Sequence, residues 1–398
     1  MTAASTAQTA TREIHVCLVS AQLVPNLIPA LMRRPEQVHL VVSRLMAETG
    51  RRLQRLLEDR GLDCVVHRDA PDHNVDVLQD YATEVAEQVD QYRGDSAVVL
   101  NATGGTKLMA MAFMEVFRDL LGAHIIYTDT SRAVLEYVAP RSRPQQPFTP
   151  VLDVESHLCA QGMTLRRAAS DQPEWRERAE HRKALTKHLA KAVARGGRFL
   201  GALNACAGKA LDRAGNTLTE PVQHLNASPR EPLRSLLKEM QDLELLEWNG
   251  GREIRFDNVP DTLYLGGHWL EDYAWHVVRD EQPDDVRVGV EGTWEGSPEN
   301  AVRNEFDLLA VHLNRMLVVE CKTAEFGRDP RKDSDILYKL DSLGRSAGGL
   351  FGTNFLISAR PLTERTRARA KANRIEVLEG KAITRLREAV RAWLSQAR

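Results

Sequence analysis

Short apolar segments alternate with helical patterns over residues 13–139, and this alternation limits the possible folds more than any other feature. We predict strands at Ile14–Ser20, Val38–Ser43, Cys64–Arg68, Ala97–Asn101 and His124–Thr128. Helical patterns lie between them, at Arg44–Arg60, Asn74–Tyr92 and Lys107–Leu121. Alternation of this length favours an α/β domain with a mainly parallel sheet covered by helices. In such sheets, ligands bind where the carboxyl ends of the strands lead into helices.

A glycine-rich segment occupies one of these strand ends. Between a predicted strand and a predicted helix the chain reads Asn101-Ala102-Thr103-Gly104-Gly105-Thr106-Lys107. Gly104 and Gly105 let the backbone approach a ligand closely, and a helix start offers unpaired N–H groups and a positive dipole end. Thr103, Thr106 and Lys107 add donors suited to phosphate. The segment predicts a phosphate-binding loop, with a tight turn capped by Thr106 as the alternative.

Polar residues also follow two other strands of the same predicted sheet. Ser20 and Gln22 come directly after the first strand, so we expect them at the same sheet edge as the glycine-rich segment. Asp72 and His73 follow the third strand in the same way. His73 is equally well explained as an ordinary loop residue.

A second constellation lies on two apolar strands near the end of the chain, Asn304–Ala310 and Leu317–Thr323. Side chains alternate faces along a strand, so Glu320 and Lys322 project to the same side. If Leu313 and Asn314 form a two-residue turn, Asp307 lies opposite Glu320, with Cβ atoms roughly 4.5–5.5 Å apart. A three-residue loop would instead send Asp307 to the other face.

Two carboxylates at that separation repel each other unless a cation lies between them. Oxygen ligands of this kind select Mg²⁺, Mn²⁺ or Ca²⁺. The adjacent Lys322 can orient a water molecule or stabilise developing negative charge on phosphorus. The alternative is a hairpin with solvated charges on one face. We favour the metal site because Glu320 directly follows the apolar run Met316–Val319.

Length, composition and charge limit the class of protein to which this chain can belong. A chain of 398 residues is long enough for two or three domains, and 43% hydrophobic and 27% charged residues are typical of a globular protein. The net charge of −2 provides no overall basic field, so nucleic-acid binding would depend on local patches or on metal. The cysteines, five in number and without CxxC spacing, indicate a reducing compartment. With neither a signal peptide nor a spanning segment in the sequence, we expect a cytoplasmic protein.

Residues 174–260 read as several helices followed by a hairpin. The predicted helix Leu233–Leu246 runs into Asn249-Gly250, a sequence typical of a tight hairpin turn. Helix and hairpin together suggest a winged helix, which is either a DNA-binding wing or a structural spacer. The acidic residues Glu239, Asp242 and Glu244 on the presumed recognition helix favour the spacer. The elements expected beyond it are His268–Arg279 (helix), Val286–Glu295 (strand), the two motif strands, Leu350–Ser358 (strand), Leu362–Asn373 (helix), Ile375–Leu378 (strand) and Lys381–Gln396 (helix).

These constellations, in this order, resemble the CARF-domain nucleases of type III CRISPR systems. In the first half the resemblance rests on Ser20-Ala21-Gln22 and Asn101–Lys107. In the second half it rests on Gly267-His268-Trp269-Leu270-Glu271, Asn304-Glu305-Phe306-Asp307, Glu320-Cys321-Lys322 and Lys339-Leu340, with Gly348-Gly349 further on. The sequence departs from a literal Pro-Asp motif, because Phe306 precedes Asp307.

From the residues we expect a disordered tail rich in Thr and Ala (1–12) and a helical, winged-helix-like linker region (151–262). The resemblance implies an N-terminal Rossmann-like CARF domain (13–150) and a C-terminal PD-(D/E)xK restriction-endonuclease-like α/β domain (263–398). It also implies that a cyclic oligoadenylate, cyclic tetra-adenylate above all, binds across a homodimer and allosterically activates a metal-dependent endonuclease. The expected substrates are single-stranded DNA, RNA, or duplex DNA that is nicked, in antiviral defence.

The resemblance also implies roles for individual residues, at the positions of this sequence that match the family's motifs. The resemblance assigns Mn²⁺ or Mg²⁺ to Asp307, Glu320 and the backbone carbonyl of Cys321. It implies that Lys322 positions the attacking water, that Glu271 is the helix-borne acid of the site and that Lys339 contacts the scissile phosphate or strand. The expected second-messenger contacts are Ser20, Gln22, Asn101, Thr103, Gly104, Gly105, Thr106 and Lys107.

An alternative function is a CARF-domain transcriptional regulator that binds DNA through the winged-helix-like region. That function requires no acidic triplet, whereas Asp307, Glu320 and Lys322 are all present. A third possibility is that the CARF domain hydrolyses its own ligand. Five basic residues near the end of the chain form either a substrate-binding patch or a solvated helix face: Arg365, Arg367, Arg369, Lys371 and Arg374.

Overall fold

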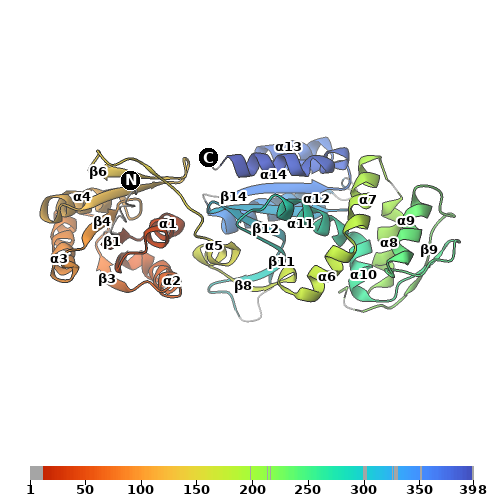
Figure 1. The fold of residues 1–398 in the computed structure, drawn as a ribbon, viewed down its shortest axis with the longest axis horizontal. Coiled ribbons are helices and arrows are strands. Elements are labelled where there is room, and N and C mark those ends of the chain that lie inside the picture. Colours follow the sequence, from red (N-terminus) through yellow and green to blue (C-terminus); the bar gives the residue numbers. More distant parts are fainter. Residues whose placement is uncertain are drawn as a thin grey trace, which may run out of the picture. The chain divides into compact units, whose positions relative to one another are not determined.

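The computed structural model describes residues 12–197, 199–212, 214, 215, 217–298, 303–324, 326, 330–349 and 352–396. The chain forms two compact units, the first ending at Met163 and the second running from Thr164 to Gln396 (Figure 1). Each unit is built around its own β-sheet. No helix of the described residues is long and apolar enough to cross a membrane.

The first unit contains a seven-stranded sheet in the order β3-β2-β1-β4-β5-β6-β7. Its strands are β1 (Glu13–Leu18), β2 (Gln37–Ser43), β3 (Cys64–Ala70), β4 (Ala97–Asn101), β5 (His124–Asp129), β6 (Val134–Ala139) and β7 (Gln146–Pro147). The first five are mutually parallel, whereas β6 and β7 are antiparallel additions at one edge. The predicted parallel sheet is therefore confirmed.

Helices connect these strands: α1 (Val24–Arg33), α2 (Ala47–Glu58), α3 (Val75–Arg93), α4 (Lys107–Leu121) and α5 (Val154–Ala160). Helices α3 and α4 pack together over one face of the sheet, and α1 and α2 lie over the other (Figure 1). In α4 the side chains of Met109, Ala112, Phe113 and Phe117 are buried. This helical spacing is what places them all on the face that packs onto the sheet.

Four elements of the first unit were not predicted, namely helices α1 and α5 and strands β6 and β7. Helix α1 contains prolines at its start and at position 29, and proline normally argues against a helix interior. Strand β7 lies within the proline-rich segment 141–150, where proline argues against a strand. Its pairing with β6 is short, so no apolar alternation marks it in the sequence.

The second unit contains a six-stranded sheet in the order β15-β14-β13-β12-β11-β8. Its strands are β8 (Met163–Ala168), β11 (Asp285–Trp294), β12 (Asn304–His312), β13 (Arg315–Lys322), β14 (Gly352–Ser358) and β15 (Ile375–Glu379). Strands β11, β12 and β13 are antiparallel neighbours, and β13, β14 and β15 are parallel. Helices α11 (Trp269–Asp280), α12 (Pro330–Gly348), α13 (Glu364–Ala372) and α14 (Leu386–Ser395) accompany this sheet. Of these, α12 was not predicted.

The turn between β12 and β13 has the predicted two residues. His312 pairs with Arg315, so only Leu313 and Asn314 lie between the strands. Both have positive φ values, 46° and 65°, as expected for a type I′ turn. The register that follows places Asp307 on the same sheet face as Glu320, and the prediction that depended on this turn is confirmed.

The middle of the chain packs into the second unit. It consists of α6 (Pro173–His181), α7 (Lys183–Ala194), α8 (Leu200–Ala210), α9 (Leu233–Asp242) and α10 (Val259–Leu263), with a small antiparallel pair of strands, β9 (Val222–His224) and β10 (Glu253–Arg255). Buried side chains of α7, α8 and α9 belong to the same hydrophobic core as those of β12, β13 and α14.

The predicted helix is present as α9, but the predicted tight hairpin at Asn249-Gly250 was wrong. Strand β10 pairs with β9, from before α9, and among the described residues an isolated bridge between Glu247 and Arg255 is the pairing across residues 248–254, a loop longer than two residues. The middle region shares a core with the C-terminal sheet.

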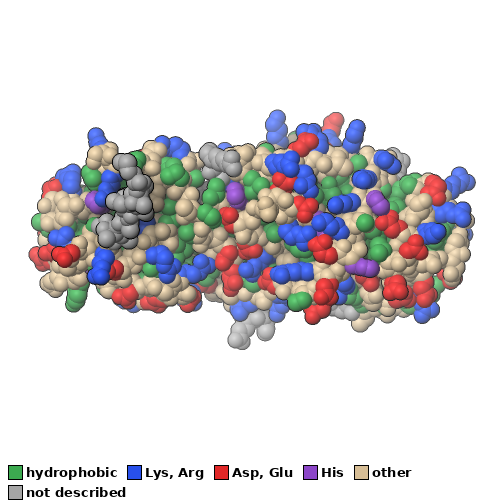
Figure 2. Space-filling model, viewed as in Figure 1, with side chains coloured by type: hydrophobic (Ala, Val, Ile, Leu, Met, Phe, Trp, Pro, Cys, Tyr) green, Lys and Arg blue, Asp and Glu red, His purple; other side chains and the backbone are tan. Residues whose placement is uncertain are grey.

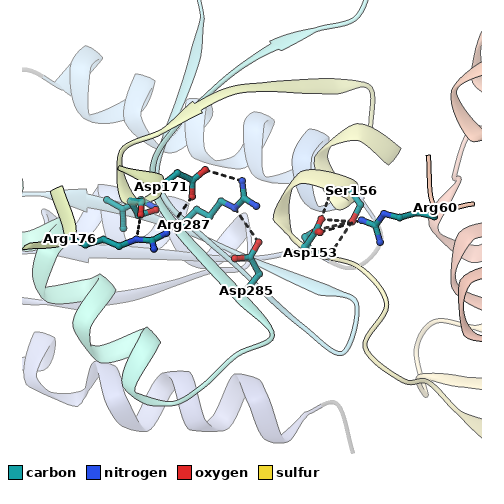
Figure 3. A network of polar contacts seen from close by, with 9 residues as sticks. Arg60, Asp153, Ser156, Asp171, Arg176, Asp285 and Arg287 are labelled. Atoms are coloured by element: carbon teal, nitrogen blue, oxygen red, sulfur yellow. Dashed lines mark hydrogen bonds and ion pairs between the residues drawn. The ribbon is translucent and has the colours of Figure 1, made fainter. Parts of the chain in front are cut away.

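Polar contacts fix local geometry in each unit separately (Figure 3). In the second unit, Arg287 of β11 lies between Asp171 and Asp285, with a guanidinium nitrogen 3.2 Å from a carboxylate oxygen of each. In the first unit, Asp153 caps α5 by accepting from the Ser156 backbone nitrogen at 2.7 Å, and Arg60 donates to the same carboxylate at 3.2 Å. Basic and acidic side chains are interspersed on the face shown in Figure 2, in agreement with the near-zero net charge.

Candidate functional site

The hydrogen-bonded pairing of strands β12 and β13 stops at the acidic residues Asp307 and Glu320. Their ladder ends at the pair Leu308 and Val319, one residue before Asp307 and Glu320 would face each other. The backbone nitrogen of Cys321 donates instead to Oδ2 of Asp307, at 2.6 Å. A side-chain carboxylate thus takes the role that a backbone carbonyl of β12 would have in a continued ladder. The strand ends are left open at the residues predicted to hold metal.

Lys322 lies between the two acidic side chains. Its Nζ atom is 2.6 Å from Oε1 of Glu320 and 3.7 Å from Oδ2 of Asp307. Burial disfavours the ammonium, but the two carboxylates outweigh burial and raise the pKa of Lys322. The lysine is therefore held in its charged form at the centre of the site.

A third acid, Glu271, comes from the first turn of α11. Burial raises the pKa of Glu271 well above its ordinary value, and the negative charge of Asp307 raises it further. Burial also raises the pKa of Asp307, and burial together with Asp307 raises that of Glu320. One lysine does not compensate three acids in this environment, and a donor set of buried, mutually repelling carboxylates fits a divalent cation.

The fit to a metal also involves Cys321. Burial raises the pKa of its thiol well above the ordinary value, so the sulfur is not a thiolate ligand. In a strand, the N–H and C=O of one residue point to the same neighbour, so the Cys321 carbonyl faces the side on which its nitrogen meets Asp307. In the positions described, no three His, Cys, Asp or Glu side chains are close enough together to enclose a metal ion. With the lysine bonded to both acids, metal binding requires the side chains around Lys322 to rearrange.

Glu271 owes its position to an irregular segment before α11. A π-helical turn covers Tyr264–His268, and Gly267 has a φ of 149°. A Cβ atom on Gly267 would lie 2.5 Å from Oγ1 of Thr323, so only glycine fits there. This close approach connects the start of α11 to the residue that follows Lys322.

A buried ion network fixes the same region from the other side. Arg182 is only 4% exposed and donates to Asp272 at 2.8 Å. Its guanidinium also lies 3.6 Å from Asp261. The guanidinium carbon stacks on the Tyr264 ring, 3.9 Å from the ring centroid. Asp272 directly follows Glu271 in α11. The middle region therefore supplies the cation that fixes the helix carrying Glu271.

The structure brings further charged residues to the site. Lys339, on the exposed side of α12, lies near enough to lower the pKa values of Asp307 and Glu320 against the effect of burial. Glu305 adds negative charge that raises the pKa values of Asp307 and Glu271, and His268 lies close enough to interact with Glu305 and Lys322. We had not predicted a role for Glu305 or His268, although both belong to the motifs quoted above.

In the first unit, the glycine-rich loop follows β4 as predicted. A Cβ atom on Gly104 would lie 1.9 Å from the carbonyl oxygen of Leu18, and Gly105 has a φ of 71°. Both positions require glycine, for space in the first case and for backbone conformation in the second. The loop is therefore pressed against the end of β1.

Buried polar residues hold the loop in this shape. Asn101 is fully buried and donates to Pro25 O at 2.9 Å, while its Oδ1 accepts from Thr103 N and Oγ1 at 3.1 and 2.6 Å. Thr103 Oγ1 in turn accepts from the backbone nitrogen of Thr128 at 2.7 Å. In this structure Asn101 and Thr103 shape the loop.

Four predicted contacts remain, two exposed at the start of α4 and two that follow β1. Thr106 caps α4 by accepting from Met109 N at 3.2 Å, and Lys107 is exposed at the first position of the helix. Ser20 donates to the Gln22 carbonyl at 3.3 Å, and the buried Oε1 of Gln22 has no hydrogen-bond partner among the described residues. An unpartnered buried acceptor of this kind is available to a hydrogen-bond donor.

The family models match both halves of the chain. A Card1 CARF domain model matches residues 14–157, and a Card1-like endonuclease domain model matches residues 260–397. The chain belongs to the CARF-domain nucleases of type III CRISPR systems. The glycine-rich loop lies in the CARF domain, and Glu271, Asp307, Glu320 and Lys322 lie in the endonuclease domain.

Solved structures of similar overall fold span almost the whole of this CARF nuclease. Protein VC1899 from Vibrio cholerae is 21% identical, with 97% of this chain and 98% of that chain covered and a TM-score of 0.84. Can2 from Sulfobacillus thermosulfidooxidans, solved in complex with cyclic tetra-adenylate, is 22% identical over 96% and 97%, with a TM-score of 0.76. A type III CRISPR defence DNA nuclease activated by cyclic oligoadenylate is 17% identical over 88% of this chain and 45% of that chain, with a TM-score of 0.53. No curated protein sequence matches significantly.

The basic residues of α13 do not form one open patch in this CARF nuclease. Arg367 donates to Glu379 at 2.5 Å, and Arg369 donates to Ser334 at 2.7 Å and stacks on Tyr338. These two side chains are therefore engaged within the endonuclease domain. All five cysteines are free.

Proposed function

We propose that this CARF nuclease is an endonuclease switched on by cyclic tetra-adenylate and dependent on Mn²⁺ or Mg²⁺. The observation that carries the proposal is the opening between β12 and β13, where Asp307, Glu320 and Lys322 meet. Similarity in fold to Can2, solved with cyclic tetra-adenylate, supports the choice of messenger. Single-stranded DNA, RNA and nicked duplex DNA are the candidate substrates.

The CARF loop suits such a messenger chemically. The backbone at Gly104 and Gly105, the start of α4 and the Lys107 ammonium offer donors and positive charge to phosphates. The unpartnered Oε1 of Gln22 can accept from an adenine amino group. A ring ligand with two-fold symmetry suits a two-fold homodimer in which each protomer supplies one loop.

In the endonuclease domain, Asp307, Glu320 and the Cys321 carbonyl would hold the metal ion. When bound, the ion supplies a Lewis acid that polarises a phosphoryl oxygen and lowers the pKa of a water molecule. Lys322 orients that water and stabilises negative charge on the phosphate. Glu271 contributes a further acid from α11, and Lys339 contacts the scissile strand.

Control by messenger requires two arrangements of the dimer. A ligand shifts such an equilibrium only if it binds the active arrangement more tightly, and a shift from 1:99 to 99:1 needs roughly a 10⁴-fold difference in affinity. The Lys322 contacts with Glu320 and Asp307 describe an arrangement in which the lysine takes the place of a metal ion. Replacement of that lysine by metal is one local change that activation could control.

The direct test is cleavage of labelled single-stranded DNA, single-stranded RNA and supercoiled plasmid with Mn²⁺, with and without cyclic tetra-adenylate. We expect cleavage only with the messenger and none from Glu320→Ala. Cleavage without the messenger would contradict the proposed switch.

A DNA-binding regulator is the other function to test, and the structure gives it less support. The β9–β10 strand pair and the helices of the middle region share a core with the nuclease sheet and are not a separate module. Sequence-specific duplex binding that survives Glu320→Ala, with no cleavage of any substrate, would favour the regulator.

A further inference from the structure

The middle region contains a stretch of chain without acidic residues. Between Glu180 and Asp212 the sequence has no aspartate or glutamate, and it has seven lysines and arginines. The rest of the chain holds 46 lysines and arginines against 55 aspartates and glutamates, so this stretch departs from the charge balance of the protein. Most of it forms α7 and α8. Positive charge is therefore concentrated on two helices of the second unit.

Helix α7 buries one face and exposes cations on the other. Leu185 and Leu189 are buried in the core of the second unit. Lys187, Lys191 and Arg195, which follows the last residue of the helix, are exposed. Residues four apart lie on one side of a helix, so these three cations form a continuous row about 12 Å long, which we call the basic row.

The cations of the basic row have no acidic partners. In the part of the chain that the structure describes, none of the three forms a salt bridge, whereas Lys183, one turn earlier, lies 3.5 Å from Asp280. Helix α9 packs against α7, but its Glu239 is already 2.9 Å from Nδ1 of His188. Like charges four residues apart destabilise a helix. A bound anion would relieve that repulsion.

Helix α7 is also fixed to the helix that carries Glu271. Arg182, directly before α7, donates to Asp272, the next residue after Glu271. The hydroxyl of Thr186 lies 2.8 Å from that of Tyr264, in the π-helical turn before α11. Helices α7 and α11 pack against each other. The basic row therefore has a fixed position relative to the acids of the endonuclease domain.

We propose that Lys187, Lys191 and Arg195 bind the sugar-phosphate backbone of the nucleic-acid substrate outside the metal site. The proposal rests on the proposed nuclease function and assigns a substrate-binding surface to it. A polyanion fits a row of unpaired cations, because each phosphate that they neutralise releases counterions. The net charge of −2 gives the chain no overall attraction for nucleic acid, so a local row of this kind is needed. Phosphate contacts carry no base information, and we expect binding without sequence preference.

The test uses full-length protein with cyclic tetra-adenylate. Lys187→Gln, Lys191→Gln and Arg195→Gln are made singly and together. A second triple variant keeps the charges, with Lys187→Arg, Lys191→Arg and Arg195→Lys. The matched control is Arg166→Gln, which removes one exposed cation from the edge strand β8 of the same unit.

Affinity for labelled single-stranded DNA, single-stranded RNA and duplex DNA is measured without divalent metal over a range of salt concentrations. Cleavage is then measured with Mn²⁺ as a function of substrate concentration. Melting curves and calorimetric titration with the messenger check that the variants fold and keep a working CARF domain.

Loss of one phosphate contact lowers the slope of log affinity against log salt by about 0.7 for a single strand. We expect that change for each single variant. The neutral triple variant should lower the slope by about 2 and bind at least about tenfold more weakly at 0.1 M salt, with a matching rise in the substrate concentration needed for cleavage. The charge-retaining triple variant and Arg166→Gln should keep the wild-type slope.

The outcomes that would overturn the inference are distinguishable from failure of the proposed function. Unchanged affinity and slope in the neutral triple variant, with messenger-dependent cleavage intact in wild type, would remove the basic row from the substrate site and leave the proposed function standing. An equal loss of slope in Arg166→Gln and in the single variants would mean that overall charge matters and the row does not. Wild-type protein that neither binds nor cleaves any of the three nucleic acids would overturn the proposed function, and the inference with it.

Discussion

The Oδ2 atom of Asp307 lies 2.6 Å from the backbone nitrogen of Cys321, and this contact replaces the ladder where β12 and β13 part. The acid that we assign to metal binding therefore also has a structural partner. Asparagine at this position would keep an acceptor for the Cys321 nitrogen while removing the charge. The two roles of Asp307 can be separated by mutation.

We predict that Asp307→Asn loses cleavage by at least about 100-fold while its melting temperature stays near that of wild type. Asp307→Ala should lose cleavage equally but also stability, by about 1–3 kcal/mol, because the Cys321 nitrogen is left unpaired. Cleavage rates and melting curves of the two variants check this. Equal stability of both variants would show that the hydrogen bond contributes little.

A second prediction tests metal binding by its effect on protein stability, independently of cleavage. Mn²⁺ at 100 times its dissociation constant should stabilise the second unit by about 2.7 kcal/mol. Glu320→Gln should abolish that stabilisation, because it removes a metal ligand. All six tryptophans lie after residue 174, so fluorescence-detected unfolding reports on this unit. Equal stabilisation of Glu320→Gln by Mn²⁺ would exclude Glu320 as a ligand.

Gly104 provides a test of the CARF loop. Its Cβ would lie 1.9 Å from the Leu18 carbonyl, so Gly104→Ala must displace the loop from β1. We expect a loss of cyclic tetra-adenylate binding of more than about tenfold and a stability cost of about 1–3 kcal/mol. Calorimetric titration with the messenger measures the affinity. Gly251→Ala, where no atom lies within 4 Å, is the control and should bind as wild type does.

In the buried ion network around Arg182, losing one charge should destabilise the second unit more than losing both charges of an ion pair. Arg182→Met leaves Asp272 buried without its cation and should destabilise the second unit by about 3–5 kcal/mol. Arg182→Met combined with Asp272→Asn should recover part of that loss. Tryptophan fluorescence in urea measures each variant. A double variant no more stable than the single one would mean that the cost comes from packing, including the contact with Tyr264.

Acid sensitivity of the first unit should come from a histidine pair. Nδ1 of His39 lies 2.8 Å from Nε2 of His67, and burial together with His67 lowers the pKa of His39 to about 4. Burial also lowers the pKa of His67. Unfolded histidine titrates near 6.5, so below that pH the unfolded state binds more protons than the folded state. The stabilisation is complete above about pH 6.5 and is lost as pH falls toward about 4.

We therefore expect the free energy of unfolding of the first unit to fall by about 1–3 kcal/mol between pH 6.5 and pH 4. Hydrogen exchange of β2 and β3 amides measures this unit without interference from the second. Replacing both histidines by glutamine should flatten the pH dependence. A slope that persists in that variant would assign the effect to other groups.

Local patterns determined much of this protein. Strand and helix alternation predicted β1 to β5 and the helices α2, α3 and α4, because each has an apolar face of regular period. The two-residue turn at Leu313 and Asn314 followed from spacing alone, and with it the shared face of Asp307 and Glu320. Motifs of this kind are local, so a single sequence contains them.

Only the tertiary structure decided which distant segments complete the site. Arg182 comes from the middle region, and its contact with Asp272 joins residues far apart in sequence. Helix α1 forms despite its prolines, and β7 forms within a proline-rich segment, because burial and strand pairing override weak local preferences. Long-range packing has no period along the chain, and for this reason neither the shared core of the second unit nor the packing of α7 against α11 could be predicted from the sequence by itself.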